Sequence, residues 1–395
     1  LSTASTTKAP ALSKSTVWSP THQDQSDEQD PLQKGVPRVN MPGITLLGAP
    51  IGNANFVRSE LEAKIEKIQK TIDMLPNIQD PHTQFVLLRS CLALPKLSFI
   101  LRTTDTSPFA DVLHQFDSLV REALSITLGA GLTDLQWKQA SLPVSMGGLG
   151  LRGAKQHGPG FYCSSVLSSL RLSRTLQGIE EEGTPLTDGS LRTVSAKVGE
   201  VVTTEVLSGL SQKALSLMVD EHSLSQLKAS TRDLGSVREV ARLESLGLPR
   251  AGAWLNSPPI PALGLHLRPT EFTMAVKLRL GCRVYDREGP CPACLRPSDV
   301  YGDHSLCCGS WGERITRHNH LRDHIHNMAA SAVLNPVKEG QHLLPGDNRK
   351  PADVLIPNWV RGQDAGLDIT IVHPLQQETV AVAAANPWPC PHSCT

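Results

Sequence analysis

The chain has 395 residues and carries 38 Lys plus Arg against 38 Asp plus Glu, so its formal net charge is zero. This length predicts two or three domains, and the even charge argues against a simple basic nucleic-acid coat or an acidic tail protein. No run approaches the roughly 18 apolar residues of a membrane span, so we expect no membrane contact. The sequence begins with Leu1 in LSTASTTKAP, which lacks the apolar stretch of a secretory signal, and we expect a fragment.

The composition changes near residue 40. Residues 1–40 are rich in Ser, Thr, Pro, Gln and Asp, which predicts a disordered or displaced loop because little apolar burial offsets the ordering entropy. The following stretch, MPGITLLGAPI at 41–51, is apolar and broken by Gly and Pro. That pattern predicts a strand and a tight turn.

Three helices are expected next. The first has apolar residues spaced by three or four positions and ends at Pro76. These residues are Val57, Leu61, Ile65, Ile68, Ile72 and Leu75. A second helix is expected at 81–94, and a third has an apolar face from Phe109 to Leu124 and stops near Gly129. We interpret the apolar stripes as the core of a helical bundle rather than as cofactor-binding faces.

Three glycines lie close together in SMGGLGLRGA. Gly147, Gly148 and Gly150 do not have the G-x-G-x-x-G spacing of a phosphate-binding loop, so a tight turn with close backbone packing is the better interpretation. Residues 156–257 predict a helical connector without a chemical signature. The four prolines in 258–269 predict a linker.

Nine cysteines are unevenly spread, and five of them lie between Cys282 and Cys308. Cys291 and Cys294 form a C-x2-C pair, followed by His304 and, after three residues, by Cys308. Four such ligands within a short stretch predict a structural zinc site. Cys307 competes with Cys308 as the fourth ligand, and the alternative is a set of free buried cysteines with a chance histidine.

Basic residues and histidines follow this cluster. His318 and its neighbouring histidines show no H-E-x-x-H motif, so we interpret them as polar residues beside a nucleic-acid groove rather than as a second metal site. Arg314, Arg317, Arg322 and Lys338 are candidates for phosphate contacts.

Two short strands are expected in ADVLI and LDITIV, near the end of the chain. With a turn centred between Val360 and Arg361, Asp353 would lie opposite Asp368, about 5 Å away. Two carboxylates at that separation suit one Mg²⁺, which could activate water and stabilise charge at a scissile phosphate. The alternative is a common hairpin with two aspartates near its turn.

Taken in order, CPAC, GDHSLCC, RHN at 317–319, PAD at 351–353 and LDITIV resemble the C-terminal region of non-LTR (LINE-like) retrotransposon proteins. In that family a CCHC zinc motif precedes a restriction-like endonuclease of the PD-(D/E)XK type. Upstream, LLGAPIG at 46–52 resembles the primer-grip end of a reverse-transcriptase palm. FVLLRSCLALPKLSFILRT and QASLPVSMGGLGLR are similar to the thumb that follows. The resemblance covers about residues 41–155 and 270–375.

The resemblance implies roles for individual residues. The zinc ligands would be Cys291, Cys294, His304 and Cys308. Asp353 and Asp368 would be the metal-binding acids of the nuclease. The residues near nucleic acid would be Arg317, His318, Asn319 and Arg322, and Glu339 is a further candidate acid.

The sequence departs from the family pattern in two places. No Y-x-D-D-like polymerase motif is present, and Thr370 occupies the position where the nuclease lysine is expected. We therefore expect a fragment of a reverse transcriptase–endonuclease with no polymerase activity and at best weak Mg²⁺-dependent nicking. The alternatives are a non-catalytic zinc-dependent nucleic-acid-binding protein, an inactive relic, or an interaction scaffold.

The expected fold is α+β. It consists of a mostly helical thumb-like region, a small zinc module and a short, truncated α/β nuclease-like domain. The expected ranges are 1–40 (loop), 41–155 (palm end and thumb-like helices), 156–257 (connector), 258–269 (linker), 270–312 (zinc module), 313–380 (nuclease-like) and 381–395 (irregular tail). The resemblance implies DNA and element RNA as partners and an intracellular, nuclear location. Residues 266–361 carry 13 Lys plus Arg against 10 Asp plus Glu, but the chain as a whole is neutral, so we expect weak nucleic-acid binding with a shallow salt dependence.

Overall fold

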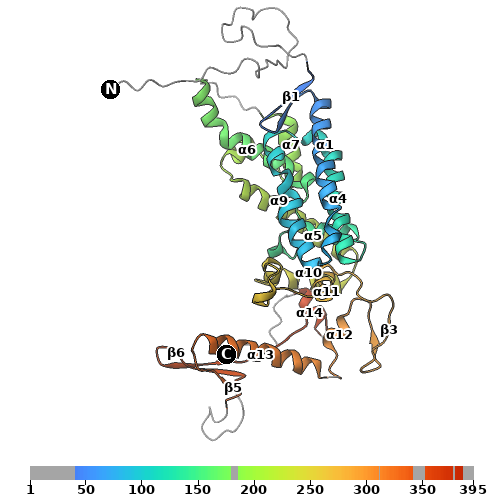
Figure 1. The fold of residues 1–395 in the computed structure, drawn as a ribbon, viewed down its shortest axis with the longest axis vertical. Coiled ribbons are helices and arrows are strands. Elements are labelled where there is room, and N and C mark those ends of the chain that lie inside the picture. Colours follow the sequence, from blue (N-terminus) through green and yellow to red (C-terminus); the bar gives the residue numbers. More distant parts are fainter. Residues whose placement is uncertain (1–40, 179–185, 311, 341–351, 377–378, 386–395) are drawn as a thin grey trace, which may run out of the picture. The chain divides into compact units, whose positions relative to one another are not determined.

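The fold is known from a computed structural model, drawn in Figure 1. The residues that the structure describes are 41–178, 186–310, 312–340, 352–376 and 379–385. The expected loop at 1–40 and most of the expected tail at 381–395 lie outside the described residues. Within the described part the fold is α+β and mostly helical, with small antiparallel sheets, as the sequence predicts.

The chain divides into two compact units. The first combines Leu1–Ala229 with Gly252–Thr273, and the second combines Ser230–Ala251 with Met274–Thr395. Residues 258–269, expected to be a linker, therefore belong to the first unit. The connector expected at 156–257 is divided between the two units.

The first unit begins with a hairpin and continues as helices (Figure 1). Its strands pair Gly43 with Gly52 and Leu46 with Ala49. Its strands and longer helices are β1 (Gly43–Leu46), β2 (Ala49–Gly52), α1 (Ala54–Ile72), α2 (Pro81–Leu87), α3 (Leu94–Thr103), α4 (Ala110–Leu128), α5 (Asp134–Ser141), α6 (Ala154–Gln177), α7 (Asp188–Val198) and α8 (Thr204–Ser208). Two further helices, α9 (Gln212–Asp233) and α11 (Pro269–Leu280), begin in this unit and end in the second.

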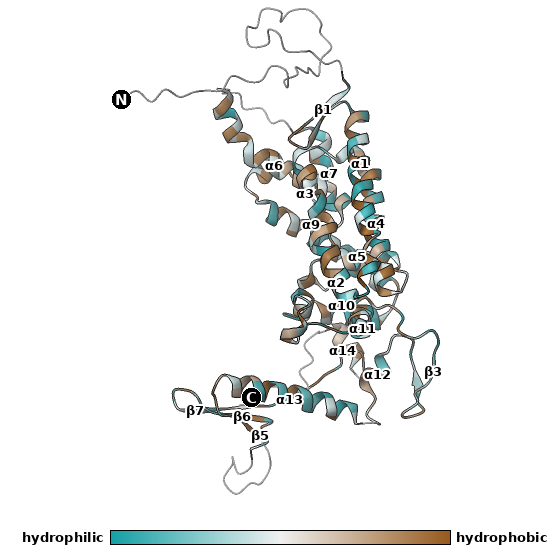
Figure 2. Ribbon diagram, in the orientation of Figure 1, coloured by the Kyte–Doolittle hydropathy of each residue, from teal (hydrophilic) through white to brown (hydrophobic). Residues whose placement is uncertain are grey.

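Helix α1 confirms the periodicity of its sequence. All six predicted apolar positions, from Val57 to Leu75, are buried. Asn53 caps the helix by accepting a hydrogen bond from the Phe56 N–H. In Figure 2 hydrophilic and hydrophobic residues alternate along α1, as expected of a helix with one face on the core.

The helix expected at 81–94 is interrupted. A π-helical turn, Leu88–Leu92, joins α2 to α3, so the helical stretch continues to Thr103. By length and composition alone Pro81–Thr103 could cross a membrane, because an 18-residue stretch within it has a mean hydropathy of 1.5. A buried core helix passes the same test, and Phe85, Leu88 and Leu97 are fully buried in this core. The expectation of no membrane contact stays a prediction.

The glycine-rich segment forms the tight turn that the sequence predicts. Gly147 and Gly150 have φ values of +86° and +79°, which side chains other than glycine rarely adopt. A Cβ at Gly148 would lie 2.0 Å from the Leu142 carbonyl oxygen. The turn leads into α6, whose first amide groups, at Ala154 and Lys155, donate to the buried Asp117 carboxylate.

The end of the segment expected to be a linker contacts α2. The Leu267 N–H donates to Nδ1 of the buried His82, and His266 Nε2 lies 3.1 Å from Asp80 Oδ2. The His82 ring stacks on Phe272, with centroids 4.8 Å apart. Contacts of His82 and His266 therefore hold this segment against α2, which the proline content alone did not indicate.

The second unit has short elements and a small core. It contains α10 (Val237–Leu246), β3 (Gly289–Pro290), β4 (Pro297–Ser298), α12 (Asp303–Cys307), α13 (Glu313–Ser331), β5 (Val337–Lys338), β6 (Val354–Val360), β7 (Gln363–Leu367) and α14 (Val380–Ala385). The three strands β5, β6 and β7 form an antiparallel sheet. Ala329 of α13 packs on Val354 and Ile356 of β6, while the rest of α13 is largely hydrophilic (Figure 2).

The hairpin near the predicted acids differs from the expected one. The second strand, expected at 367–372, is β7 and ends at Leu367. The turn lies at Arg361 and Gly362, which both have positive φ, as a two-residue hairpin turn requires. An irregularity between Ile356 and Val360 shifts the pairing. Sequence spacing cannot reveal such a bulge, because the extra residues are unpaired.

Candidate functional site

Three cysteines and one histidine converge in the second unit. Cys291, Cys294, His304 and Cys308 each offer a ligand atom, and these atoms all lie within 4.8 Å of one another. Cys291 Sγ lies 3.9 Å from Cys308 Sγ, and Cys294 Sγ lies 3.2 Å from His304 Nε2. A tetrahedron with Zn–S bonds of 2.3 Å requires sulfur atoms about 3.8 Å apart and somewhat shorter S···N distances. The group can therefore hold a metal ion such as zinc.

A hairpin presents the first two ligands. Gly289 pairs with Ser298 and Pro290 with Pro297, and the Cys291 N–H donates to the Arg296 carbonyl. The connecting turn bends sharply because Leu295 has a φ of +62°. This geometry turns the thiols of Cys291 and Cys294 to the same side, as the C-x2-C spacing predicts.

Helix α12 presents the other two ligands. His304 lies in its first turn, and Cys308 follows its last residue and donates its N–H to the His304 carbonyl. Cys307, the competing candidate, is not in the ligand group. Cys307 is half-buried, and burial raises the pKa of its thiol to about 11; the position of its sulfur atom outside the group of four ligand atoms sets it apart from Cys308.

Asp299 positions His304 and was not predicted as part of the site. Its carboxylate accepts hydrogen bonds from the N–H groups of Tyr301, Asp303 and His304, at 2.8 to 3.1 Å. Burial disfavours the charged carboxylate, but these N–H groups outweigh it, and the pKa of Asp299 is lowered. The feature of the sequence that could have pointed to Asp299 is an acidic residue shortly before a short helix that contains a metal ligand.

Arg238 on α10 fastens that helix to α12. Its guanidinium lies 4.0 Å from the Tyr301 ring centroid, and its Nη2 donates to Asp303 Oδ1 at 3.0 Å. Asp303 is the residue directly before His304. No local pattern could have linked Arg238 to the zinc motif, because 65 residues separate Arg238 from Asp303.

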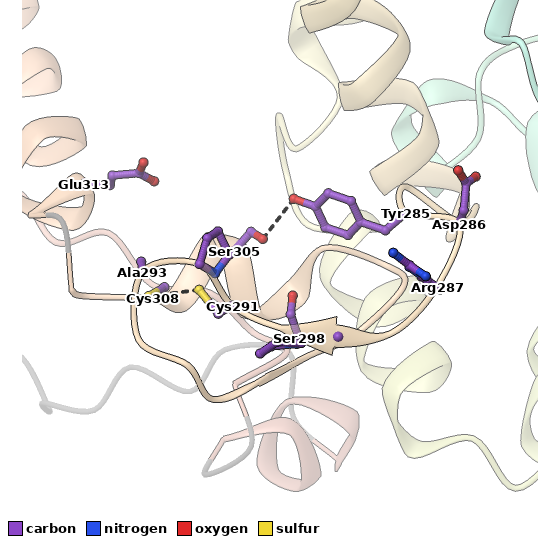
Figure 3. Close-up of a pocket in the computed structure, with 12 residues that line it drawn as sticks. Tyr285, Asp286, Arg287, Cys291, Ala293, Ser298, Ser305, Cys308 and Glu313 are labelled. Atoms are coloured by element: carbon purple, nitrogen blue, oxygen red, sulfur yellow. Dashed lines mark hydrogen bonds between the residues drawn. The ribbon is translucent and has the colours of Figure 1, made fainter.

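A cavity of about 530 Å³ lies beside the ligand group (Figure 3). Cys291 and Cys308 line it together with Tyr285, Ser305 and Arg287. The Tyr285 hydroxyl and Ser305 Oγ are 3.0 Å apart and share a hydrogen bond, drawn as a dashed line in Figure 3. The ligand group takes four protein atoms and leaves no open coordination position, so a metal held there is structural rather than catalytic.

The two predicted nuclease acids lie at the end of the hairpin. Neither belongs to a strand, but Val354 pairs with Leu367, so the same register would oppose Asp353 to Asp368. Asp353 Oδ2 accepts a hydrogen bond of 2.7 Å from the Ile369 N–H. The Asp353 carboxylate therefore reaches the backbone beside Asp368, which is itself exposed.

The predicted nucleic-acid contacts lie on α13 and have different surroundings. His318 Nε2 lies 3.1 Å from Asp353 Oδ2, and His318 Nδ1 lies 3.5 Å from Asn319 Oδ1. Arg317 donates to the Leu306 carbonyl at 2.5 Å. Arg322 pairs with Asp323 and Glu339, so its charge is largely neutralised within the protein. His318 thus contacts Asp353, Arg317 contacts the Leu306 carbonyl, and Arg322 pairs with other acids.

No protein-family model matches this chain, and no curated protein matches it.

Proposed function

We propose that this chain is part of a retroelement reverse transcriptase–endonuclease and that its second unit binds nucleic acid beside a weak, Mg²⁺-dependent nicking site. The proposal depends on one observation above all. The Cys3His group directly precedes α13 in the sequence. His318 on α13 contacts the Asp353 carboxylate at the end of the β6–β7 hairpin. The order of motifs along the chain matches the order of the retrotransposon family, with the zinc ligands before the acids.

The acids suit a hard cation. Carboxylate oxygens are the ligands that Mg²⁺ prefers, and Asp353 with the exposed Asp368 would hold the ion. Within the described residues, both hydrogen bonds of the Asp353 side chain go to Oδ2, which leaves Oδ1 for a metal. A bound Mg²⁺ would supply an activated water and stabilise charge on a phosphate. Weak activity is expected because Thr370 replaces the expected lysine.

Plasmid nicking tests this proposal. Purified full-length protein with Mg²⁺ should convert supercoiled plasmid to the open circle slowly, and Asp353→Asn should abolish the conversion. Asp364→Asn is a matched control, because Asp364 lies in β7 and its Oδ1 accepts from the Asn358 N–H within the same hairpin. Equal nicking by wild type and Asp353→Asn would reject the nuclease assignment.

The second candidate is a non-catalytic, zinc-dependent nucleic-acid-binding protein. It is favoured by the two donors that already occupy Asp353 Oδ2 and by the missing lysine. This candidate predicts zinc-dependent retention of oligonucleotides in a gel-shift assay without any nicking. Absence of binding in the zinc-loaded protein would exclude both candidates.

A further inference from the structure

A second cavity, of about 510 Å³, lies in the second unit between α13 and the residues that follow β7. Arg314, Arg317 and His318 line it from the side of α13, and Thr370 and His373 line it from the other side. No Asp or Glu is among the described residues that line it. Four side chains that can carry positive charge, Arg314, Arg317, His318 and His373, therefore line one cavity without a lining carboxylate.

Two buried nitrogen atoms of residues that line this cavity, Arg317 Nε and His373 Nε2, have no hydrogen-bond partner within the described part of the chain and are shielded from solvent. Arg317 also donates to the Leu306 carbonyl. Because the two nitrogen atoms have no solvent-exposed surface, an anion in the cavity contacts them only after the side chains rotate. Buried polar groups without a partner are costly, so a rotation that pairs them with an anion would be favourable.

The remaining lining suits one part of a nucleic-acid strand. Leu306, Ile369 and Ile371 supply apolar surface next to the donors. Pockets with apolar walls and a few convergent polar groups are typical of ligand sites. A nucleotide unit combines an anionic phosphate, which arginine binds through directed N–H groups, with a base or sugar that can rest on apolar side chains.

We propose that this cavity binds a backbone phosphate of a nucleic-acid strand through Arg317 and His373, with Arg314 at its rim. The proposal deepens the proposed function and rests on it. Thr370, at the position where the nuclease lysine is expected, lines the same cavity. The positive charge missing at that position is supplied by the arginines of α13, and the phosphate is held near Asp353, which His318 contacts.

Fluorescence anisotropy with a short single-stranded DNA oligonucleotide tests the proposal on the full-length, zinc-loaded protein. We expect Arg317→Gln and His373→Gln each to weaken binding about tenfold, the effect of losing one hydrogen bond to a charged group. Arg361→Gln is the matched control for Arg317→Gln, because Arg361 is exposed at the hairpin turn and its loss removes the same single charge. The control should stay within about twofold of wild type.

Arg317→Gln removes a hydrogen bond to Leu306 and could disturb the fold, so Arg314→Gln provides a second variant at an exposed position of the same wall. It should weaken binding by a smaller factor than Arg317→Gln while zinc content and helical circular dichroism stay unchanged. Unchanged oligonucleotide affinity in His373→Gln and Arg314→Gln would reject the cavity as the phosphate-binding site, while nucleic-acid binding by the protein would stand.

Calorimetry with inorganic pyrophosphate tests anion binding in the cavity independently of the proposed function. If the wild type binds no oligonucleotide, the proposed function fails. Pyrophosphate binding that is lost in His373→Gln would still support the anion pocket. Absence of binding to both probes would overturn the pocket as well.

Discussion

The two units are stabilised in different ways. The first buries large apolar side chains on several long helices, among them Phe85, Leu97 and Phe116. Within the described residues, the sheet of the second unit has a buried cluster of three small or branched side chains, Ala329, Val354 and Ile356. Elsewhere this unit also buries apolar side chains such as Leu243, Val276 and Leu280, and it adds ion pairs, such as Arg238 with Asp303, and the Cys3His group.

This difference shows where metal ligands and ion pairs contribute to stability besides the burial of apolar side chains. A small region cannot bury enough apolar surface to offset its ordering entropy, and metal ligands commonly make up the deficit. We therefore expect the region around the Cys3His group to depend on metal and the first unit to depend on packing. Four measurements follow, from the largest expected effect to the smallest.

Cys291→Ser should have the largest effect. Loss of one thiolate removes a ligand from the group, and structural zinc binding can contribute about 10 kcal/mol or more to folding. We expect bound zinc to fall from about one per chain to near zero, with the region around α12 becoming susceptible to proteolysis and the first unit staying protected.

Cys307→Ser is the control for that experiment. Cys307 is adjacent to a ligand but does not belong to the ligand group. It should retain zinc at the wild-type level. Equal zinc loss in both variants would contradict the ligand assignment.

Phe116→Ala should affect the first unit alone. Phe116 is 1% exposed in the core between the helices, and such truncations cost about 3–5 kcal/mol. Urea unfolding followed by circular dichroism measures the loss, and zinc content should not change. Phe99→Ala, at a side chain that is 51% exposed, should cost less than about 1 kcal/mol. Similar losses in the two variants would show that burial does not stabilise this unit.

Asp117 should make the first unit sensitive to pH. Burial raises the pKa of Asp117 to about 6, against the hydrogen bonds from Ala154 and Lys155, which favour the charged form. The native state thus binds this proton more tightly than the unfolded chain. The stabilisation is fully present below the unfolded pKa of about 4 and is lost as the pH rises through about 6.

Asp117→Asn should remove this dependence. Relative to wild type, the variant should gain up to about 3 kcal/mol in free energy of unfolding between pH 4 and pH 7. Urea midpoints at several pH values measure the difference. Parallel curves for the two proteins would show that Asp117 does not titrate in this range.

Asp299→Ala should have the smallest effect of the four. It removes the carboxylate that accepts the N–H groups at the start of α12 and so loosens His304. Loss of such an orienting group lowers metal affinity about tenfold, which competition with a zinc chelator can measure. Asp286→Ala removes the same charge from an exposed residue in the cavity wall and should leave zinc affinity unchanged. Equal zinc affinities of the wild type and Asp299→Ala would show that Asp299 contributes to the fold but not to zinc binding.

Local patterns predicted much of the first unit. The spacing from Val57 to Leu75 predicted the buried face of α1, and Gly129 ends α4 with a φ of +59° as expected. Such patterns succeed because a helix repeats every 3.6 residues and each residue contacts its near neighbours. The π-helical turn at Leu88–Leu92 was not predicted, because packing around it rather than local spacing decides such an insertion.

In the second unit the sequence by itself determined which residues can bind metal, since C-x2-C and the His304–Cys308 spacing bring four ligands within reach of one ion. Only the tertiary structure decided between Cys307 and Cys308, because that choice depends on which thiol faces the other ligands at the end of α12. The tertiary structure also decided where β7 ends and that Arg317 shares a cavity with His373. These arrangements join residues far apart in the chain, and their geometry depends on a bulge, a turn and buried partners that no local spacing encodes.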